Sequence, residues 1–319
     1  MVETLLKIGS LQGSVSMGSI KDGASIFAPT LMEDPTYSNV TGGQNVIITH
    51  QPGDIYVVTS GVAARSTILE TDVAFDSGFI QIVDSLLVVP ARLETTARDA
   101  YTDLTSFVGA LYATDLIAEF ADTPNITLFI PRNAAFQQLA GTFSNMATED
   151  LRKVLRYHMA TKMVVHSEDL LNGTKVIMGD GKTIHITRFN NNIYVDSAQM
   201  IQTDILIANG VVQMIDNVLN PDNADADPDV TQNTQTPVFP LQGATSTGTA
   251  APTPFASALP CTISCPVTNS PSGSVSAATS KPSSSSNGVP PARCTGLGGA
   301  GIGLGVAMGA AGMNYIGLV

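Results

Sequence analysis

Side chains suited to chemistry are sparse in this chain, and histidine is the first to consider. The 319 residues include four histidines, and no two of them have the spacing of metal ligands. His158 follows Tyr157 and continues an apolar helical face that begins at Leu151. A histidine in that position is either a hydrogen-bonded core residue or, if its flanks are exposed, part of a binding surface. The apolar face favours the structural role for His158 and for Tyr157 beside it.

The chain lacks the motifs of common enzyme active sites. It contains no Gly-x-Ser-x-Gly turn, no His-Glu-x-x-His helix, no Gly-x-x-x-x-Gly-Lys-Ser/Thr phosphate loop and no dinucleotide fingerprint. The aspartate-rich run at 222–229 lacks the glycine and the twelfth-position acid that a calcium loop needs, because Asn233 stands at that position. We predict no enzyme activity, cofactor or metal ion, and keep a hydrolase with an unfamiliar site as an alternative.

The charge balance argues against nucleic acid as a partner. The chain has 27 acidic and 15 basic residues, a formal net charge of -12, and no cluster of lysine and arginine. Nucleic acid needs a concentrated basic face, which this sequence does not offer. Only 13% of the residues are charged, so uncharged polar segments must fill much of the chain.

N-glycosylation sequons and cysteines give information on the cellular compartment of the chain. Asn-x-Thr acceptors for N-glycans begin at three positions: Asn39, Asn125 and Asn172. All three cysteines lie in the last fifth of the chain, so no disulfide joins its earlier part. Cys261 and Cys265 can close a small loop as a disulfide.

The composition changes abruptly at residue 222. From 222 to 293 the chain is rich in Ser, Thr, Pro, Ala and Gly, with too few large apolar residues to offset the entropy of ordering. We predict a disordered stalk there, either O-glycosylated or a plain linker.

The final segment, 294–319, is predicted to anchor the chain in a membrane. Its residues from Leu297 onward carry no charge. Upstream lie the small residues Ser286, Asn287 and Gly288, then a polar spacer, which is the order of a glycosylphosphatidylinositol attachment signal. Lipid attachment at one of these three residues is our prediction, and a retained transmembrane span or an unanchored tail are the alternatives.

Two stretches of the chain repeat one another. Gly78–Pro90 and Gly210–Pro221 share Gly, Gln and Asp at the same internal spacing, offset by 132 residues (210 minus 78). Upstream, Asp54–Val57 resembles Asn192–Val195. Asn209-Gly210, between two apolar runs, predicts a hairpin with a type I′ turn, in which both central residues have positive φ. We therefore predict two related modules, at residues 1–90 and 91–221.

The second module is predicted to begin with helices and end with strands. Apolar residues at helical spacing over 104–111 predict one helix, and Thr148 with the two acids after it predicts a capped start for another. Asn133 is predicted to cap a helix that runs through Leu139. Short strands are expected at 126–130, 163–165, 175–178, 183–187 and 192–195. Helices followed by a set of short strands indicate an α+β fold.

Three blocks of the second module resemble the fasciclin domain family of extracellular adhesion modules. Residues 127–136, Thr-Leu-Phe-Ile-Pro-Arg-Asn-Ala-Ala-Phe, are similar to the first signature of that family. Leu155-Arg-Tyr157-His158 is similar to its Tyr-His motif, and Gly210–Pro221 to its closing strand. The resemblance covers residues 91–221 and implies helices packed on a β-sandwich or wedge. It also links Tyr157 and His158 to adhesion, and Asp204 and Ile205 to an Asp-Ile motif implicated in integrin contact in animal members.

The first module matches only the later part of the family pattern. Leu5–Gly9 stands where the Tyr-His helix is expected, with Ile8-Gly9 in place of Tyr-His. The first signature would fall before Met1, so we expect this module to be N-terminally incomplete. The same expectation accounts for the absence of a signal peptide from the first residues.

These observations predict a non-enzymatic cell-surface protein that contacts other surface, cell-wall or matrix components, including a second copy of itself. A small-molecule or lipid-binding protein of an internal compartment such as the vacuole is the alternative from another class, because a groove between helices and sheet can hold such ligands.

Overall fold

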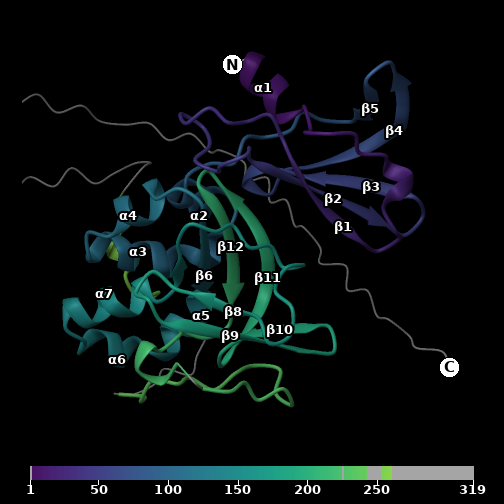
Figure 1. Cartoon of the computed structure of the whole chain (residues 1–319). Coiled ribbons are helices and arrows are strands. Elements are labelled where there is room, and N and C mark those ends of the chain that lie inside the picture. The colour runs from purple at the N-terminus through teal and green to yellow at the C-terminus, as the bar shows by residue number, and fades with distance from the viewer. Residues whose placement is uncertain (1, 225, 243–252, 261–319) are drawn as a thin grey trace, which may run out of the picture. The chain divides into compact units, whose positions relative to one another are not determined.

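The computed structural model describes residues 2–224, 226–242 and 253–260, and all of them belong to one compact unit, Met1–Cys265. Within it the chain forms two modules, each built around an antiparallel hairpin of two long strands (Figure 1). The α+β class predicted from the sequence is confirmed.

The first module is a five-stranded antiparallel meander in the order β1-β2-β3-β4-β5. Its strands are β1 Ser25–Pro29, β2 Asn45–Gln51, β3 Ile55–Thr59, β4 Arg65–Phe75 and β5 Gly78–Val83. The helix α1 (Val2–Ile8) and the short 3-10 turn η1 (Met17–Ser19) precede these strands, and a second 3-10 turn, η2 (Gly61–Ala63), lies between β3 and β4. Apolar side chains from α1, η1 and the sheet, such as Ile8, Met17 and Ile48, form its core.

The second module has a seven-stranded sheet in the order β7-β6-β12-β11-β10-β9-β8. Its strands are β6 Ile126–Pro131, β7 Met159–Ala160, β8 Lys175–Ile177, β9 Thr183–Phe189, β10 Asn192–Val195, β11 Ala198–Ile207 and β12 Gly210–Ile215. All neighbours are antiparallel except β6 and β12, which are parallel. A parallel pair requires a crossover connection, and the chain between β6 and β12 supplies it.

Helices cover one face of this sheet (Figure 1). They are α2 Leu93–Asp99, α3 Thr105–Ala113, α4 Ile117–Asp122, α5 Asn133–Gln138, α6 Ala140–Ser144 and α7 Thr148–Arg156. The 3-10 turns that follow β5 in the chain are η3 Thr102–Leu104, η4 Pro221–Asn223 and η5 Ala256–Ala258. Leu128 and Ile130 of β6 face these helices, while Phe129 joins a second core on the opposite face. Because both faces are covered, every residue of β6 is buried.

The predicted hairpin is present, but its predicted turn type is wrong. Ile207 pairs with Gly210, so the two turn residues are Ala208 and Asn209, and neither has positive φ. Gly210 is instead the first residue of β12, where a Cβ would lie 1.9 Å from the carbonyl oxygen of Ile126 on the parallel strand β6. The glycine is required by the close approach of that strand rather than by the turn.

Three smaller expectations also need correction. Residues 163–165 form a loop rather than a strand, because side chains instead of a strand ladder hold them. The Asn133 side chain does not cap its own helix: its Oδ1 accepts from the Ser106 N–H in the first turn of α3. Helix α7 begins at Thr148 as predicted, but no side chain caps it.

The second module extends beyond residue 221, where the sequence placed its end. Residues 226–242 and 253–260 pack against the helical face through Phe239, which is buried, and Phe255, which contacts Phe136 and Phe143. The Asn217 side chain also donates to the Thr236 carbonyl at 2.8 Å. The packing of these two aromatic residues was not predicted because the segment around them is polar, although each aromatic ring buries a large apolar area.

Several sequence predictions fall outside the described residues: the rest of the stalk to 293, the disulfide of Cys261 and Cys265, the attachment residues Ser286, Asn287 and Gly288, and the tail 294–319. Among the residues that are described, no helix has the length and apolar character to cross a bilayer.

Candidate functional site

Tyr157 and His158, the first binding candidates, lie in the protein interior. Both have no exposed surface. The Tyr157 hydroxyl donates to Asp196 Oδ2 at 3.0 Å. His158 Nδ1 donates to the Val154 carbonyl at 2.7 Å, and its Nε2 accepts from the Leu219 N–H at 3.0 Å. The pair joins α7 to the strands and to the segment after β12, and neither ring can reach a ligand from outside.

Burial also fixes the protonation state of His158. The low-polarity surroundings lower its pKa from 6.5 to about 4, because the charged imidazolium would lose its hydration. Both nitrogens are already used in hydrogen bonds to the backbone, so the ring is a neutral structural connector at neutral pH.

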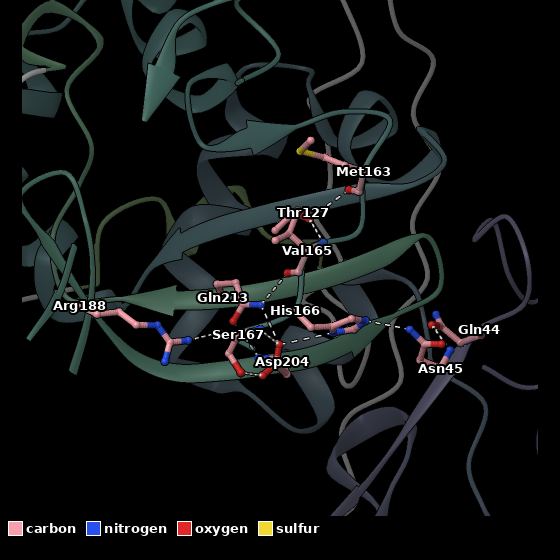
Figure 2. A network of polar contacts seen from close by, with 10 residues as sticks. All are labelled: Gln44, Asn45, Thr127, Met163, Val165, His166, Ser167, Arg188, Asp204 and Gln213. Carbon is pink, nitrogen blue, oxygen red and sulfur yellow. Dashed lines mark hydrogen bonds and ion pairs between the residues drawn. The ribbon is translucent and has the colours of Figure 1, made fainter. Parts of the chain in front are cut away.

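Asp204, the other acidic candidate, lies at a bulge in the middle of β11. The pairing of β11 with β12 shifts register between Gln202 and Ile205, and Asp204 has φ +60° there. Its carboxylate is buried and accepts hydrogen bonds from the Ser167 N–H at 2.9 Å, the Ser167 hydroxyl, and Gln213 Nε2 at 2.9 Å (Figure 2). Gln213 Oε1 in turn accepts from the Asp204 N–H at 2.9 Å.

These hydrogen bonds hold down the loop at 163–167. Gln213 Nε2 also donates to the Val165 carbonyl at 3.1 Å, and Thr127 Oγ1 accepts from the Val165 N–H at 2.8 Å (Figure 2). Burial by itself would raise the pKa of Asp204, but hydrogen bonds from the surrounding donors hold it below its usual range. Asp204 therefore stays ionised at neutral pH and acts as the anchor of the loop. Ile205, its neighbour, is buried in the core.

The first module contains the same arrangement, 132 residues earlier (204 minus 72). Asp72 lies at a bulge in β4 with φ +55°, and it exchanges two hydrogen bonds with Gln81, both at 2.8 Å. The Ser16 hydroxyl donates to Asp72 at 2.7 Å, as the Ser167 hydroxyl donates to Asp204. Burial would raise the pKa of Asp72, but these donors lower it to about 2. Two copies of one bulge, carboxylate and glutamine show that its first role is structural.

In the second module the loop at 163–167 places His166 at the contact between the two modules. Asn45 Nδ2 donates to His166 Nε2 at 2.8 Å, and Phe27 stacks on the imidazole with ring centroids 4.0 Å apart. The other ring nitrogen, Nδ1, lies 3.5 Å from Asp204 Oδ1. Gln44 Nε2 adds a hydrogen bond to the Ile207 carbonyl at 2.6 Å. The Asp204 network thus reaches the first module through one histidine.

The three sequons differ in accessibility. Asn125 bridges the modules: its Oδ1 accepts from the Thr41 N–H at 2.7 Å, and its Nδ2 donates to Thr41 Oγ1 at 2.8 Å. A glycan on Asn125 would compete with that bridge. Asn172 is exposed and Asn39 is partly exposed, and N-glycans on them stay a prediction.

An open groove of about 690 Å³ lies beside the Asp204 network, between the first sheet and β9–β11. Phe27 and Tyr101 give it aromatic surface. Among the described residues, the side chains of Arg65 and Glu168 in this groove make no hydrogen bond or ion pair. Burial, and then the charge of Asp169, raise the pKa of Glu168. A hydroxyl-rich ligand would find donors, acceptors and aromatic faces here.

Reasoning from the sequence missed the groove residues and His166, because they come from distant segments. One available signal could have located the network: Thr71-Asp72-Val73 and Thr203-Asp204-Ile205 recur with the same 132-residue offset as the hairpin, each nine residues before its glutamine. A repeated polar residue inside a repeated strand indicates a structural role in both copies.

The Asp204 network generates a stability prediction. Asp204→Ala leaves buried donors of Ser167 and Gln213 without an acceptor, and we expect it to lower the free energy of unfolding by about 3 kcal/mol. Asp180→Ala is the control, because that exposed aspartate accepts only a local bond from the Lys182 N–H. Chemical denaturation measures both; equal losses would contradict the assignment.

His158 generates a prediction about pH. Between pH 6.5 and about 4 the unfolded chain takes up a proton that folded His158 does not, so its contribution is intact above pH 6.5 and is lost as the pH falls. We expect this to remove about 3 kcal/mol of unfolding free energy across that window. His158→Gln, whose amide can still accept from Leu219, should flatten the profile by that amount. An NMR titration of the wild-type ring near pH 6.5 would refute it.

Comparison with known proteins gives the site its family context. The fasciclin domain model matches residues 102–221. A fasciclin-like arabinogalactan protein of Arthroderma benhamiae is 35% identical over 213 residues, covering 67% of this chain and 50% of the relative. One of Cercospora beticola is 30% identical over 187 residues, covering 58% and 47%. The chain thus spans about half the length of these curated relatives.

More distant relatives include human periostin, 27% identical over 186 residues, which cover 56% of this chain and 21% of periostin. A solved FAS1 domain pair from the insect cell adhesion molecule Fasciclin I aligns with 70% of this chain and 81% of its own at 14% identity and a TM-score of 0.39, a likeness too low to add to the assignment. Residues 102–221 are therefore a fasciclin domain, and the chain belongs to the fasciclin domain family.

Proposed function

We propose that this protein is a non-enzymatic adhesion-type fasciclin protein that holds a cell-wall or matrix component in the groove between its two modules. The observation that carries the proposal is the pair of unpartnered side chains, Arg65 from one module and Glu168 from the other, facing one open groove. Fungal fasciclin-like relatives support the adhesion class.

The chemistry of the groove favours a hydroxyl-rich polymer. Arg65 can donate and Glu168 can accept hydrogen bonds, while Phe27 and Tyr101 offer apolar faces to sugar rings. The groove is open to solvent rather than enclosed, so part of a long chain could enter it, as an adhesive contact requires. The buried Asp204 contributes by fixing Ser167 in the loop that forms part of its wall.

A hydrolase receives less support. Both nitrogens of His158 are occupied by backbone hydrogen bonds. In the described part of the chain, no group of three or more His, Cys, Asp or Glu residues could hold a metal ion. The lipid-binding alternative would need an apolar site, which the groove with its Arg65 and Glu168 is not; a mainly apolar cleft of about 480 Å³ beside β5 is where that alternative would apply.

The proposal places the protein at the cell surface, held there by lipid attached at Ser286, Asn287 or Gly288. The motivation is the order of small residues, polar spacer and uncharged tail in the sequence. The polar segment before this site would then separate the modules from the membrane.

Binding through the groove is tested by cosedimentation of the full-length chain with insoluble fungal cell wall. The double variant Arg65→Ala/Glu168→Ala should bind about tenfold more weakly, the equivalent of about 1.4 kcal/mol. Arg98→Ala/Asp99→Ala is the control, since it removes an exposed, mutually paired arginine and acid from α2. Equal binding by both double variants would exclude the groove.

Lipid anchoring is tested by treating intact cells that express the protein with phosphatidylinositol-specific phospholipase. We expect release into the medium, and no surface protein when Ser286, Asn287 and Gly288 are all replaced by leucine. An unrelated lipid-anchored marker serves as the control. Retention of the protein while the marker is released would refute the anchor without affecting the groove.

A further inference from the structure

The last described segment of the chain, residues 253–260, lies in a slot on the helical face of the second module. Its turn η5 contacts α3 (Figure 1). The half-buried ring of Phe255 packs edge-on against Phe136 of α5, with centroids 6.1 Å apart, and lies 6.1 Å from Phe143 of α6. Leu259 packs against the same core. One aromatic ring is thus the main anchor of the segment.

A glycine in the middle of α3 shapes this slot. A Cβ on Gly109 would lie 2.4 Å from the carbonyl oxygen of Phe255, and the next two nearest atoms also belong to Phe255. Glycine favours a helix interior less than any residue except proline, so α3 by itself gains nothing from it. The close approach of the Phe255 backbone accounts for the glycine, which makes Gly109 part of a site for this segment.

Apolar packing alone joins the segment to the helices. Within the described chain, the hydrogen bonds of residues 253–260 stay inside the segment, such as that from the Ala258 N–H to the Phe255 carbonyl at 3.0 Å. Residues 226–242 differ, because the Gln235 N–H donates to Asp216 Oδ2 at 3.0 Å. Phe255 also has a left-handed backbone, φ +61°, which only its surroundings can maintain. The segment can therefore leave its slot without breaking a hydrogen bond.

The connection to the segment is long enough for exchange between molecules. Ten residues without charge, 243–252, join Gln242 to it, and a chain of that length spans at most about 35 Å. The segment can thus reach a slot on another copy when the two helical faces lie close together. In a single molecule the short connection keeps its effective concentration high, so an isolated copy closes on itself.

We propose that the slot formed by α3, α5 and α6 is a self-association site, at which two copies exchange residues 253–260. Phe255 of each copy then packs beside Gly109 of the other. The occupant is the segment that fills the slot within one molecule, so the exchanged contact has the same chemistry, and reciprocal exchange gives a symmetric dimer. This inference is independent of ligand binding in the groove and of lipid attachment.

The slot is probed with a peptide of residues 253–260, added to full-length protein and followed by NMR at the Gly109 amide. Phe255→Ala removes the anchor from the protein and leaves the slot free. We expect this variant to bind the peptide at least tenfold more tightly than wild type does, because the wild-type slot is already occupied. A peptide with alanine in place of its phenylalanine is the control and should not bind. No binding of the unaltered peptide to Phe255→Ala would overturn the proposal.

Exchange between copies is tested by mixing two full-length variants. Gly109→Ala closes the slot but keeps the Phe255 segment, and alanine favours the helix, so α3 should fold. Adding this variant to isotope-labelled Phe255→Ala should shift the Gly109 amide. The double variant Gly109→Ala/Phe255→Ala is the matched control and should not shift it. Equal shifts from both would overturn the exchange, and the peptide experiment does not depend on the folding of Gly109→Ala.

The wild-type chain itself should form a dimer whose fraction rises with concentration in sedimentation velocity. Phe255→Ala and Gly109→Ala should each lower that fraction at least tenfold. Phe189→Ala is the control, since it removes a partly exposed phenylalanine (45%) on β9, away from the slot, and should dimerise as wild type does. A wild-type chain that stays monomeric while Phe255→Ala binds the peptide would overturn the proposal in favour of a segment that serves only its own molecule.

Discussion

A buried carboxylate at a strand bulge holds the second module in its functional form. Asp204 is desolvated, yet it remains ionised because Ser167 and Gln213 supply donors at hydrogen-bonding distance. A buried charge without such partners would cost several kcal/mol. The bulge, the loop at 163–167 and the position of His166 therefore depend on one another, and the contact of His166 with Asn45 and Phe27 transmits the arrangement to the first module.

The same arrangement of a strand bulge, an aspartate and a glutamine occurs in both modules, although the modules differ in the elements that surround it. Asp72 and Asp204 lie at equivalent bulges, and each is hydrogen-bonded to the equivalent glutamine, so each hairpin is stabilised by its own polar side-chain pair. The modules differ at the other edge of the hairpin, where β12 has a parallel neighbour and β5 has none. Stability of the second module rests on two cores on either side of β6, whereas the first has a single small core. The apolar face of β5 follows from that difference.

Much of the second module could be predicted from its sequence because its signals are local. The apolar periodicity of 104–111, the existence of the hairpin of β11 and β12, and the start of α7 at Thr148 are each decided within a few residues. The loop at 163–165 was mistaken for a strand because its apolar residues are pinned by side chains from Thr127 and Gln213, which are distant in sequence. Phe239 and Phe255 were missed for the converse reason: single aromatic residues in a polar segment carry no periodicity.

The candidate site was less predictable. The family resemblance selected Tyr157, His158 and Asp204, which are buried, whereas the accessible groove is lined by Arg65 and Glu168, which are 103 residues apart in the sequence (168 minus 65). The most direct measurement of the central claim is the NMR spectrum of the protein titrated with soluble fungal wall polysaccharide. The account predicts shift changes concentrated at Arg65, Tyr101 and Glu168. Changes confined to surfaces outside the groove, or none at saturating ligand, would contradict it.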